Sequence, residues 1–287
     1  MELKKKIAYY PGCSLSGTAG PFGTSIEQVF DHLDLPYAEL KDWVCCGSTS
    51  AHALDHKLHY ALNLRNLALA EAQGFSEIVA PCAACYHRLA CANYDFQSNS
   101  KLLAEVNKET GLSYSGKIKV KNVLDMLYND VGVEKIKKLV KKQLTGLTLA
   151  CYYGCLNTRT PRMEKFDVTE YPVTMDRIVQ ALGARTVDWS YKTECCGASL
   201  FIAREKISAE LVSKILRDVE QHKANAIAVA CPMCHNNLDT KQADIRKRYS
   251  IETSFPVLFI SQLMGLAFGI SSEKLKIAEH FVPFKIS

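Results

Sequence analysis

Two pairs of adjacent cysteines stand out in the sequence, Cys45-Cys46 and Cys195-Cys196, each followed by a glycine. Neighbouring side chains leave the backbone in divergent directions, so two adjacent sulfurs cannot easily close on one metal ion. They can instead reach two different metal atoms of a cluster. The pairs therefore favour a centre with several metal atoms over a site for a single ion.

The cysteines occur twice along the chain in the same order. Each half has a single cysteine shortly after a Tyr-Tyr pair, then the adjacent pair, then a Cys-x-x-Cys. The spacing also agrees, with 35 and 34 residues between the adjacent pair and the Cys-x-x-Cys. Such a repeat indicates two copies of one structural unit. The two sets of five are Cys13, Cys45, Cys46, Cys82 and Cys85, and Cys155, Cys195, Cys196, Cys231 and Cys234.

The number of ligands narrows the chemistry of each set. A structural zinc ion takes four ligands, and a cubane iron–sulfur cluster also takes four cysteines. Five thiolates suit a larger or more open iron–sulfur cluster. Two alternatives stay open: a zinc ion in each half with one spare cysteine, and a vicinal or redox-active disulfide. The repeat favours Cys155 over Cys151 as a ligand, which leaves Cys91 and Cys151 as packed or unreactive thiols.

Helix and strand signals between the cysteines repeat as well. Their alternation predicts two pseudo-symmetric α/β domains, each a small mainly parallel sheet flanked by helices. In such sheets ligands gather at the carboxyl ends of the strands, where we expect the metal-cluster sites. We place the domains at residues 1–145 and 146–287. The predicted elements are helices at 24–33, 51–73, 172–183 and 202–222, and strands at 77–80, 147–153 and 226–230.

The composition is typical of a globular protein, with 48% hydrophobic and 23% charged residues in 287. The net charge of +5 is mild and no recognition motif accompanies it, so no nucleic-acid partner is expected. The longest apolar stretch, Phe255–Ile270, is shorter than the roughly 20 residues that span a bilayer, so we predict a buried helix and no membrane span. Because the amino terminus lacks the apolar core of a secretory signal, we expect a cytoplasmic location.

The doubled cysteine pattern resembles the cysteine-rich CCG domain, and nearly the whole chain resembles the B-subunit family of heterodisulfide reductase. The resemblance implies two noncubane [4Fe-4S] clusters, each held by one set of five cysteines, with a small disulfide or thiol substrate between them. It also implies two partners, a ferredoxin-like iron–sulfur subunit of the C type and a flavin-containing subunit of the A type. The chain itself has neither a ferredoxin cysteine run nor a dinucleotide-binding glycine motif. The cysteines predicted to be catalytic are Cys46, Cys85, Cys196 and Cys234.

The predicted function is therefore that of a catalytic iron–sulfur subunit in a heterodisulfide-reductase-like complex. It would reduce, or reversibly form, a thiol disulfide, with one electron from each cluster. Two other hypotheses stay open: an electron-transfer subunit of a hydroxy-acid oxidation system, and a zinc-binding module. His87 and His235, which follow the two Cys-x-x-Cys motifs, are expected to donate hydrogen bonds to cluster sulfurs or to a departing thiolate.

Overall fold

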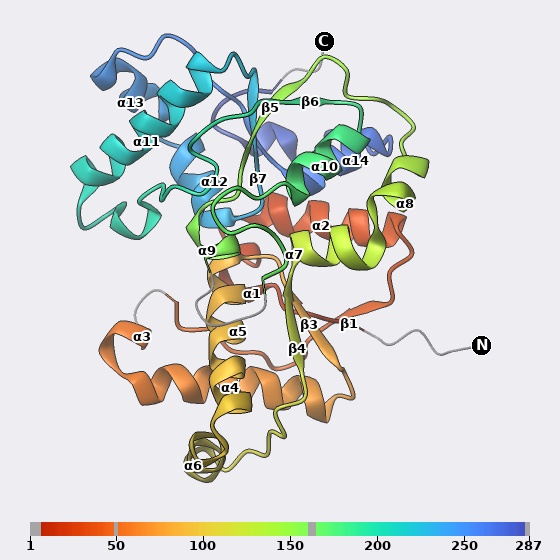
Figure 1. Ribbon diagram of the computed structural model, residues 1–287, viewed down its shortest axis with the longest axis vertical. Coiled ribbons are helices and arrows are strands. Elements are labelled where there is room, and N and C mark those ends of the chain that lie inside the picture. Colours follow the sequence, from red (N-terminus) through yellow and green to blue (C-terminus); the bar gives the residue numbers. More distant parts are fainter. Residues whose placement is uncertain (1–6, 49–50, 160–164, 285–287) are drawn as a thin grey trace.

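A computed structural model describes residues 7–48, 51–159 and 165–284. These residues contain two four-stranded sheets in which all paired strands run parallel. The strand orders are β2 (Tyr37–Glu39), β1 (Ile7–Tyr9), β3 (Glu77–Ala80), β4 (Lys119–Asn122) in the first sheet and β6 (Arg185–Thr186), β5 (Thr148–Tyr152), β7 (Ala226–Val229), β8 (Val257–Phe259) in the second. The sheets share one topology and are flanked by helices, which confirms the predicted fold class (Figure 1).

The helices of the first half follow the predicted positions with two corrections. The helix predicted over 24–33 begins earlier, at Gly20, where a proline occupies its first turn. The carboxylate of Asp55 accepts hydrogen bonds from the backbone N–H groups of Lys57 and Leu58, and so caps the start of a helix. The single helix expected over 51–73 is consequently two helices. The helical elements of this half are α1 (Gly12–Leu15), α2 (Gly20–His32), α3 (Ala51–Leu54), α4 (His56–Ala72), α5 (Ala83–Ser98), α6 (Ser100–Thr110), α7 (Val123–Asp125), the π-helical turn η1 (Met126–Val131) and α8 (Val133–Lys138).

The second half departs from prediction in its long apolar stretch. The expectation of one buried helix over 255–270 is wrong at its start, where β8 forms. The side chain of Gln262 accepts a hydrogen bond from the N–H of Phe259 at 3.0 Å, and the helix begins there. The helical elements are α9 (Cys155–Thr158), α10 (Thr174–Ala181), η2 (Ala198–Leu200), α11 (Glu205–Gln221), α12 (Pro232–Asp239), α13 (Gln242–Tyr249), α14 (Ile260–Ala267) and η3 (Ile277–Glu279).

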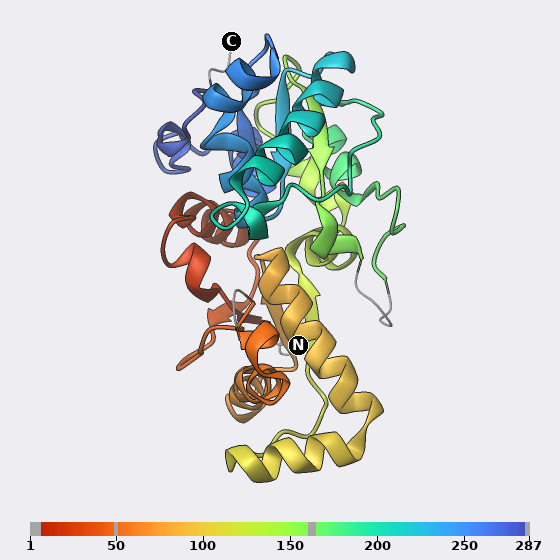
Figure 2. The same cartoon turned by 90° about the vertical axis from the view of Figure 1, so that its left-hand side faces the viewer.

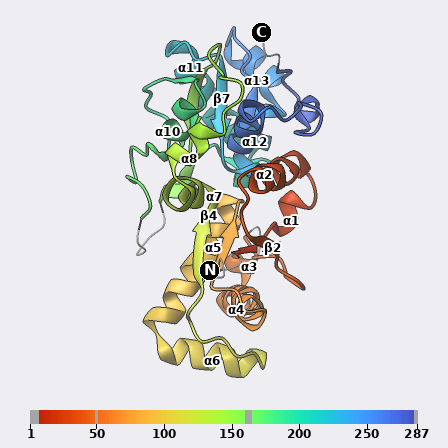
Figure 3. The same ribbon diagram turned by 90° about the vertical axis from the view of Figure 1, so that its right-hand side faces the viewer.

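Helices of the two halves pack against each other across their boundary. α2 of the first half packs against α14 of the second, with the rings of Phe22 and Phe259 stacked 4.2 Å apart and a 2.6 Å hydrogen bond between the hydroxyls of Ser25 and Ser261. In the same way α10 of the second half packs against α7 and η1 of the first. Figures 1 and 3 show α2 at the level where the halves meet. One continuous buried core therefore runs through both sheets.

The strand order determines where each sheet offers a site. The chain passes from β1 to β2 on one side and returns to β3 on the other, so a crevice opens between the carboxyl ends of β1 and β3. The second sheet has the same reversal between β5 and β7. These carboxyl edges meet near the middle of the molecule, where α5 contacts α9 (Figure 2). Among the described residues, no helix has the length and apolar character needed to cross a membrane.

Candidate metal centres

The five cysteines of the first half converge at the crevice of the first sheet. Cys13 follows β1, and its sulfur lies 3.9 Å from that of Cys45. The sulfur of Cys46 lies 3.4 Å from that of Cys85, which in turn hydrogen-bonds Cys82 at the start of α5. Loops after β1, β2 and β3 thus bring all five thiols together, as the spacing predicted.

The second half repeats this arrangement at the crevice of its sheet. Cys155 opens α9 after β5 and hydrogen-bonds Cys195. The sulfur of Cys196 lies 3.7 Å from that of Cys234, which also hydrogen-bonds Cys231 after β7. The four cysteines predicted to be catalytic therefore form two equivalent buried pairs, Cys46 with Cys85 and Cys196 with Cys234. Their catalytic role stays a prediction.

A glycine lies directly against one cysteine in each centre. Gly12 has φ +65°, and a Cβ on it would lie 2.8 Å from the sulfur of Cys85. Gly154 has φ +68°, and a Cβ on it would lie 2.9 Å from the sulfur of Cys234. Both positions need the left-handed backbone that glycine adopts without penalty, and both leave no room for a side chain. The backbone after β1 and β5 is therefore shaped around the sulfurs.

Two buried tyrosines support the loops that carry the adjacent cysteines. The hydroxyl of Tyr10 donates to the carbonyl of Val44 at 2.7 Å, and that of Tyr152 donates to the carbonyl of Glu194 at 2.5 Å. Each accepting residue immediately precedes an adjacent cysteine pair. Burial, with the nearby thiols, raises the pKa of both phenols, so they remain hydrogen-bond donors. Sequence reasoning missed this role, although the repeated Tyr-Tyr before each first cysteine was its signal.

An asparagine side chain holds the carbonyl of the second cysteine in each adjacent pair. Asn63 on α4 donates to the carbonyl of Cys46 at 3.2 Å, and Asn237 on α12 donates to the carbonyl of Cys196 at 2.6 Å. The two asparagines come from different elements, so no repeat in the sequence pointed to them. Together with the tyrosines they fix the backbone of each adjacent pair from two sides.

A buried ion pair fixes the loop before the second adjacent pair. The ammonium of Lys192 lies 3.0 Å from a carboxylate oxygen of Asp176, and both side chains are less than a tenth exposed. The other carboxylate oxygen accepts from the hydroxyl of Tyr153 at 2.7 Å. The carbonyl of Lys192 also accepts hydrogen bonds from the N–H groups of Tyr153 and Gly154. This network joins the end of β5 to the loop that leads to Cys195.

The electrostatics of each adjacent pair favour a thiolate. Hydrogen bonds from Cys45 and Cys85 lower the pKa of Cys46 to about 3, and a hydrogen bond from Cys155 lowers the pKa of Cys195 to about 6. The thiolate is the form of cysteine that binds metal. All twelve cysteines lie in the part of the chain that the structure describes, and none of them forms a disulfide. A donor set of five converging sulfurs fits an iron–sulfur centre and exceeds the four ligands of a closed zinc site.

A cavity of about 580 Å³ opens onto the second centre and reaches the first half. Its walls include all five cysteines of the second set, together with apolar side chains such as Phe201 and Met233. From the first half, Ser48, Ala83 and Arg88 complete the lining. The volume lies in the range of small-molecule sites. The cavity therefore brings both halves within reach of one small ligand.

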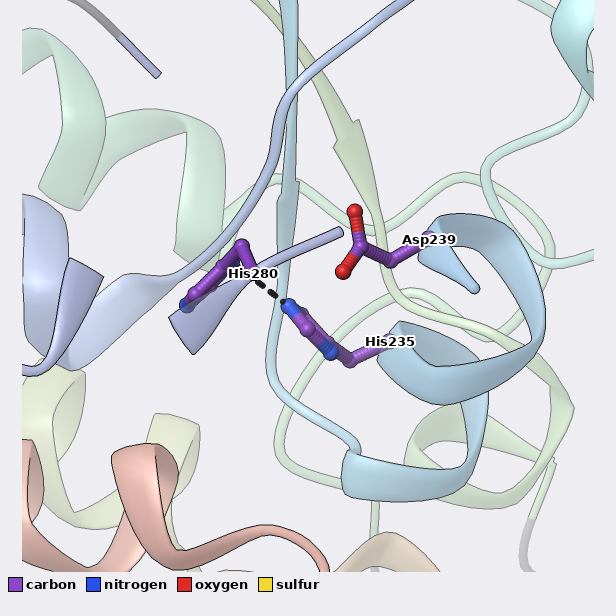
Figure 4. A group of neighbouring side chains, drawn as sticks. All are labelled: His235, Asp239 and His280. Carbon is purple, nitrogen blue, oxygen red and sulfur yellow. Dashed lines mark hydrogen bonds between the residues drawn. The ribbon is translucent and has the colours of Figure 1, made fainter. Parts of the chain in front are cut away.

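Residues near the cysteines also have structural roles. His235 Nε2 lies 3.0 Å from the carbonyl oxygen of Val257 and 2.9 Å from His280 Nδ1, and that nitrogen is itself 2.8 Å from the same carbonyl (Figure 4). The carboxylate of Asp239 accepts backbone N–H groups of residues 281 and 282. Because the carbonyl occupies the point that both rings face, this group acts as a clamp on the chain after η3 rather than as a metal site.

The hydrogen bonds expected from His87 and His235 to cluster sulfurs stay a prediction, because the sulfur contact seen for His87 is with Cys91, which is not one of the ten repeated cysteines. No hydrogen bond in the described part of the chain joins His235 to a cysteine sulfur. His87 lies beside Cys91, with both ring nitrogens 3.9 Å from its sulfur. Cys151 is fully buried within β5, where burial raises the pKa of its thiol. Cys91 and Cys151 thus lie apart from the two groups of five, as packed thiols.

Fold and site together define a duplicated parallel α/β protein with a five-cysteine group at the carboxyl edge of each sheet. Residues 7–90 and 149–239 match the family described as CCG, cysteine-rich domain. The chain belongs to this family and carries two copies of its domain, and its relatives include proteins named as the B subunit of heterodisulfide reductase. The resemblance identified in the sequence is thereby confirmed.

Two relatives and one solved structure illustrate the family. The chain is 32% identical to the 8-methylmenaquinol:fumarate reductase membrane anchor subunit of Wolinella succinogenes, over 95% of each chain. It is 30% identical to the B subunit of the ferredoxin/F(420)H(2)-dependent CoB-CoM heterodisulfide reductase of Methanosarcina acetivorans, over 96% of this chain and 94% of the relative. A hypothetical protein from Helicobacter pylori shares the fold, with a TM-score of 0.75 and 14% identity. The match covers 98% of this chain and 52% of that one. The relatives' names support an iron–sulfur electron-transfer role for the family, within complexes of several subunits.

Proposed function

We propose that this chain is the catalytic subunit of a heterodisulfide-reductase-like complex, which reduces or reversibly forms a small disulfide in the cavity between its two halves. One disulfide, two electrons and two protons give two thiols, so a site with two one-electron centres matches the reaction. The observation that carries the proposal is the cavity itself. It is lined by one complete cysteine group and by residues of the other half.

The proposed cofactors are two noncubane [4Fe-4S] clusters, held by the ten repeated cysteines. When bound, each cluster supplies one electron to the disulfide. The chain's own contribution is to hold the ligands: the buried tyrosines and asparagines fix the adjacent pairs, and Gly12 and Gly154 let the backbone approach the sulfurs. The apolar cavity walls exclude water from the reacting sulfur atoms.

Electrons must reach the chain from partners, for which we propose a flavin-containing subunit together with a ferredoxin-like iron–sulfur subunit. We retain 1–145 and 146–287 as the proposed domains and the cytoplasm as the proposed location. Because one relative is named a membrane anchor subunit, fractionation of cells at low and high salt is the appropriate test of that location. Recovery in the membrane fraction under both conditions would contradict a cytoplasmic protein.

The test starts with iron, acid-labile sulfide and zinc per chain on anaerobically purified protein. About eight irons and eight sulfides are expected for two four-iron clusters. One or two zinc ions without sulfide would instead support the zinc-binding module. The second step is turnover of small disulfides with a chemical electron donor. Iron-loaded protein that neither reduces a disulfide nor changes its cluster spectrum with thiols would refute the catalytic role.

A second candidate, an electron-transfer subunit that does not touch a disulfide, has its own supporting observation. Large apolar side chains after each adjacent pair face solvent, among them Leu54 at 81% and Ile202 at 91% exposure. Ile202 also lines the cavity. An apolar rim of this kind suits a hydrophobic electron donor or a partner surface, and the Wolinella succinogenes relative is named for a quinol reaction. Reduction of the clusters by a quinol analogue, without any response to disulfides, would favour this candidate.

A further inference from the structure

The two halves differ at one position beside the cysteine groups. Asn237 and Arg88 each lie three residues after the second cysteine of their Cys-x-x-Cys motif, on the equivalent helices α12 and α5. Asn237 is fully used within the fold, since it donates to the carbonyl of Cys196 and is hydrogen-bonded to the hydroxyl of Ser208. In the first half Asn63 on α4 holds the corresponding carbonyl. Position 88 is therefore free of the structural task that its counterpart performs.

Arg88 instead lines the cavity between the two halves. It is the single ionisable cation among the described residues that line this space, and the other lining residues are apolar or polar side chains and the cysteines of the second group. Among the described residues, no carboxylate lies within ion-pair distance of Arg88 and no hydrogen bond engages its guanidinium. Burial lowers the pKa of Arg88, while the thiols of Cys91 and Cys46 act in the opposite direction. Arginine nevertheless stays charged at any physiological pH.

The neighbouring thiol of Cys46 is the nearest source of negative charge within the chain, and the half-buried guanidinium keeps its hydrogen-bond donors available to an anionic group of a molecule bound in the cavity. The fork of five donors matches a carboxylate, sulfonate or phosphate and can bind it through two hydrogen bonds. A molecule of the size of this cavity can place a sulfur at the second cysteine group and an oxyanion at the wall formed by α5. The first half supplies the charge and the second supplies the sulfur site, which makes the two ends of the cavity unequal.

We propose that Arg88 binds an oxyanion group of the substrate, and that the thiol which reacts at the second cysteine group is an anionic one. This inference rests on the proposed disulfide function and adds a specificity-determining residue to it. It predicts that the two halves of a disulfide are not interchangeable. The half bound next to Arg88 must carry the negative charge.

The experiment uses iron-loaded full-length protein and a matched pair of thiols, 3-mercaptopropionate and 3-mercaptopropan-1-ol, which differ in charge and share the same chain length. Binding is followed by the change in the EPR spectrum of the clusters, and turnover is measured with the two corresponding symmetrical disulfides. We expect wild-type protein to bind the carboxylate thiol about tenfold more tightly or better, the effect of a charge-assisted hydrogen bond. Arg88→Met should abolish this preference and leave binding of the alcohol unchanged, and Arg88→Lys should retain part of it.

The control is Arg248→Met, which removes an exposed arginine on α13 that pairs with Glu205. Iron content and the far-ultraviolet circular dichroism spectrum verify that each variant is folded and loaded. If Arg88→Met does not fold, Arg88→Lys serves as the test variant.

Equal affinity of wild-type protein for the two thiols would overturn the Arg88 proposal and leave the disulfide function standing. A shift of a cluster midpoint potential in Arg88→Met with an unchanged preference would also overturn it, because Arg88 would then serve as a counter-charge for Cys46. Failure of every thiol and disulfide to act would refute the proposed function and the Arg88 role with it.

Discussion

Replacing Gly154 with alanine tests whether the backbone after β5 is shaped by the second metal centre. The new Cβ would lie 2.9 Å from the sulfur of Cys234, well inside the roughly 3.5–4.0 Å separation of favourable contacts. The backbone cannot yield cheaply, because Gly154 has φ +68° and ψ −177°, a region essentially restricted to glycine in which an alanine costs about 1–3 kcal/mol. The sulfur is the atom most able to move, and rotation about the Cα–Cβ bond of Cys234 would carry it out of the ligand set.

We therefore expect Gly154→Ala to fold but to lose the second centre. Iron per chain should fall from about eight to about four, with sulfide in proportion. Gly12→Ala should produce the mirror result at the first centre, because its Cβ would lie 2.8 Å from the sulfur of Cys85. Iron and sulfide assays on anaerobically purified protein measure the loss, and EPR shows which cluster remains.

Two other glycines provide the control. Gly74 and Gly111 have φ values of +78° and +67°, but a Cβ on either would meet nothing within 4 Å. Alanine there should cost a backbone strain of about 1–2 kcal/mol and leave the iron content complete. The reasoning is refuted if Gly154→Ala keeps about eight irons, or if Gly74→Ala loses as much iron as Gly154→Ala does.

Three further outcomes are expected. Lys192→Met should lower the free energy of unfolding by about 3–5 kcal/mol, because it leaves the carboxylate of Asp176 buried without its partner. Adding Asp176→Asn should restore much of this loss, as measured by urea titration. Equal stability of the single and double variants would argue against the ion pair. Cys91→Ser should leave the iron content unchanged, whereas loss of iron would make Cys91 a ligand. Burial lowers the pKa of His280 below the unfolded value of 6.5, so its share of the stability is present above pH 6.5 and is lost as the pH falls. His280→Gln should reduce the pH dependence of unfolding between pH 6.5 and 5 by up to about 1.4 kcal/mol per pH unit, and an unchanged slope would contradict this.

The cysteine groups were predictable because a repeat is visible without a structure. Ten cysteines at matching positions identified both groups of five, and the parallel-sheet rule correctly placed them at the carboxyl edges of the strands. The alternation of helix and strand signals was equally informative, and β3 was predicted over its observed span. These features depend on local pattern and topology, which a single sequence contains.

What the sequence could not reveal depends on contacts between distant residues. Asn63 and Asn237 hold equivalent carbonyls from different helices, so no spacing connects them. The division of Phe255–Ile270 into strand and helix was missed because a continuous apolar run does not distinguish a buried strand from a buried helix. Arg88 carried no signal at all until its neighbours across the cavity were known.

The contacts that α2 and α10 make with the opposite half bear on how the chain arose. The face of α2 that carries Phe22 and Ser25 is buried by α14, so a half expressed alone would expose an apolar surface. Two copies of one ancestral half could bury the same surfaces by pairing as a symmetric dimer. In such a dimer every substitution appears at both centres. Duplication and fusion into one chain remove that constraint. The two halves can then differ at equivalent positions, as they do where the first half has Arg88 and the second has Asn237.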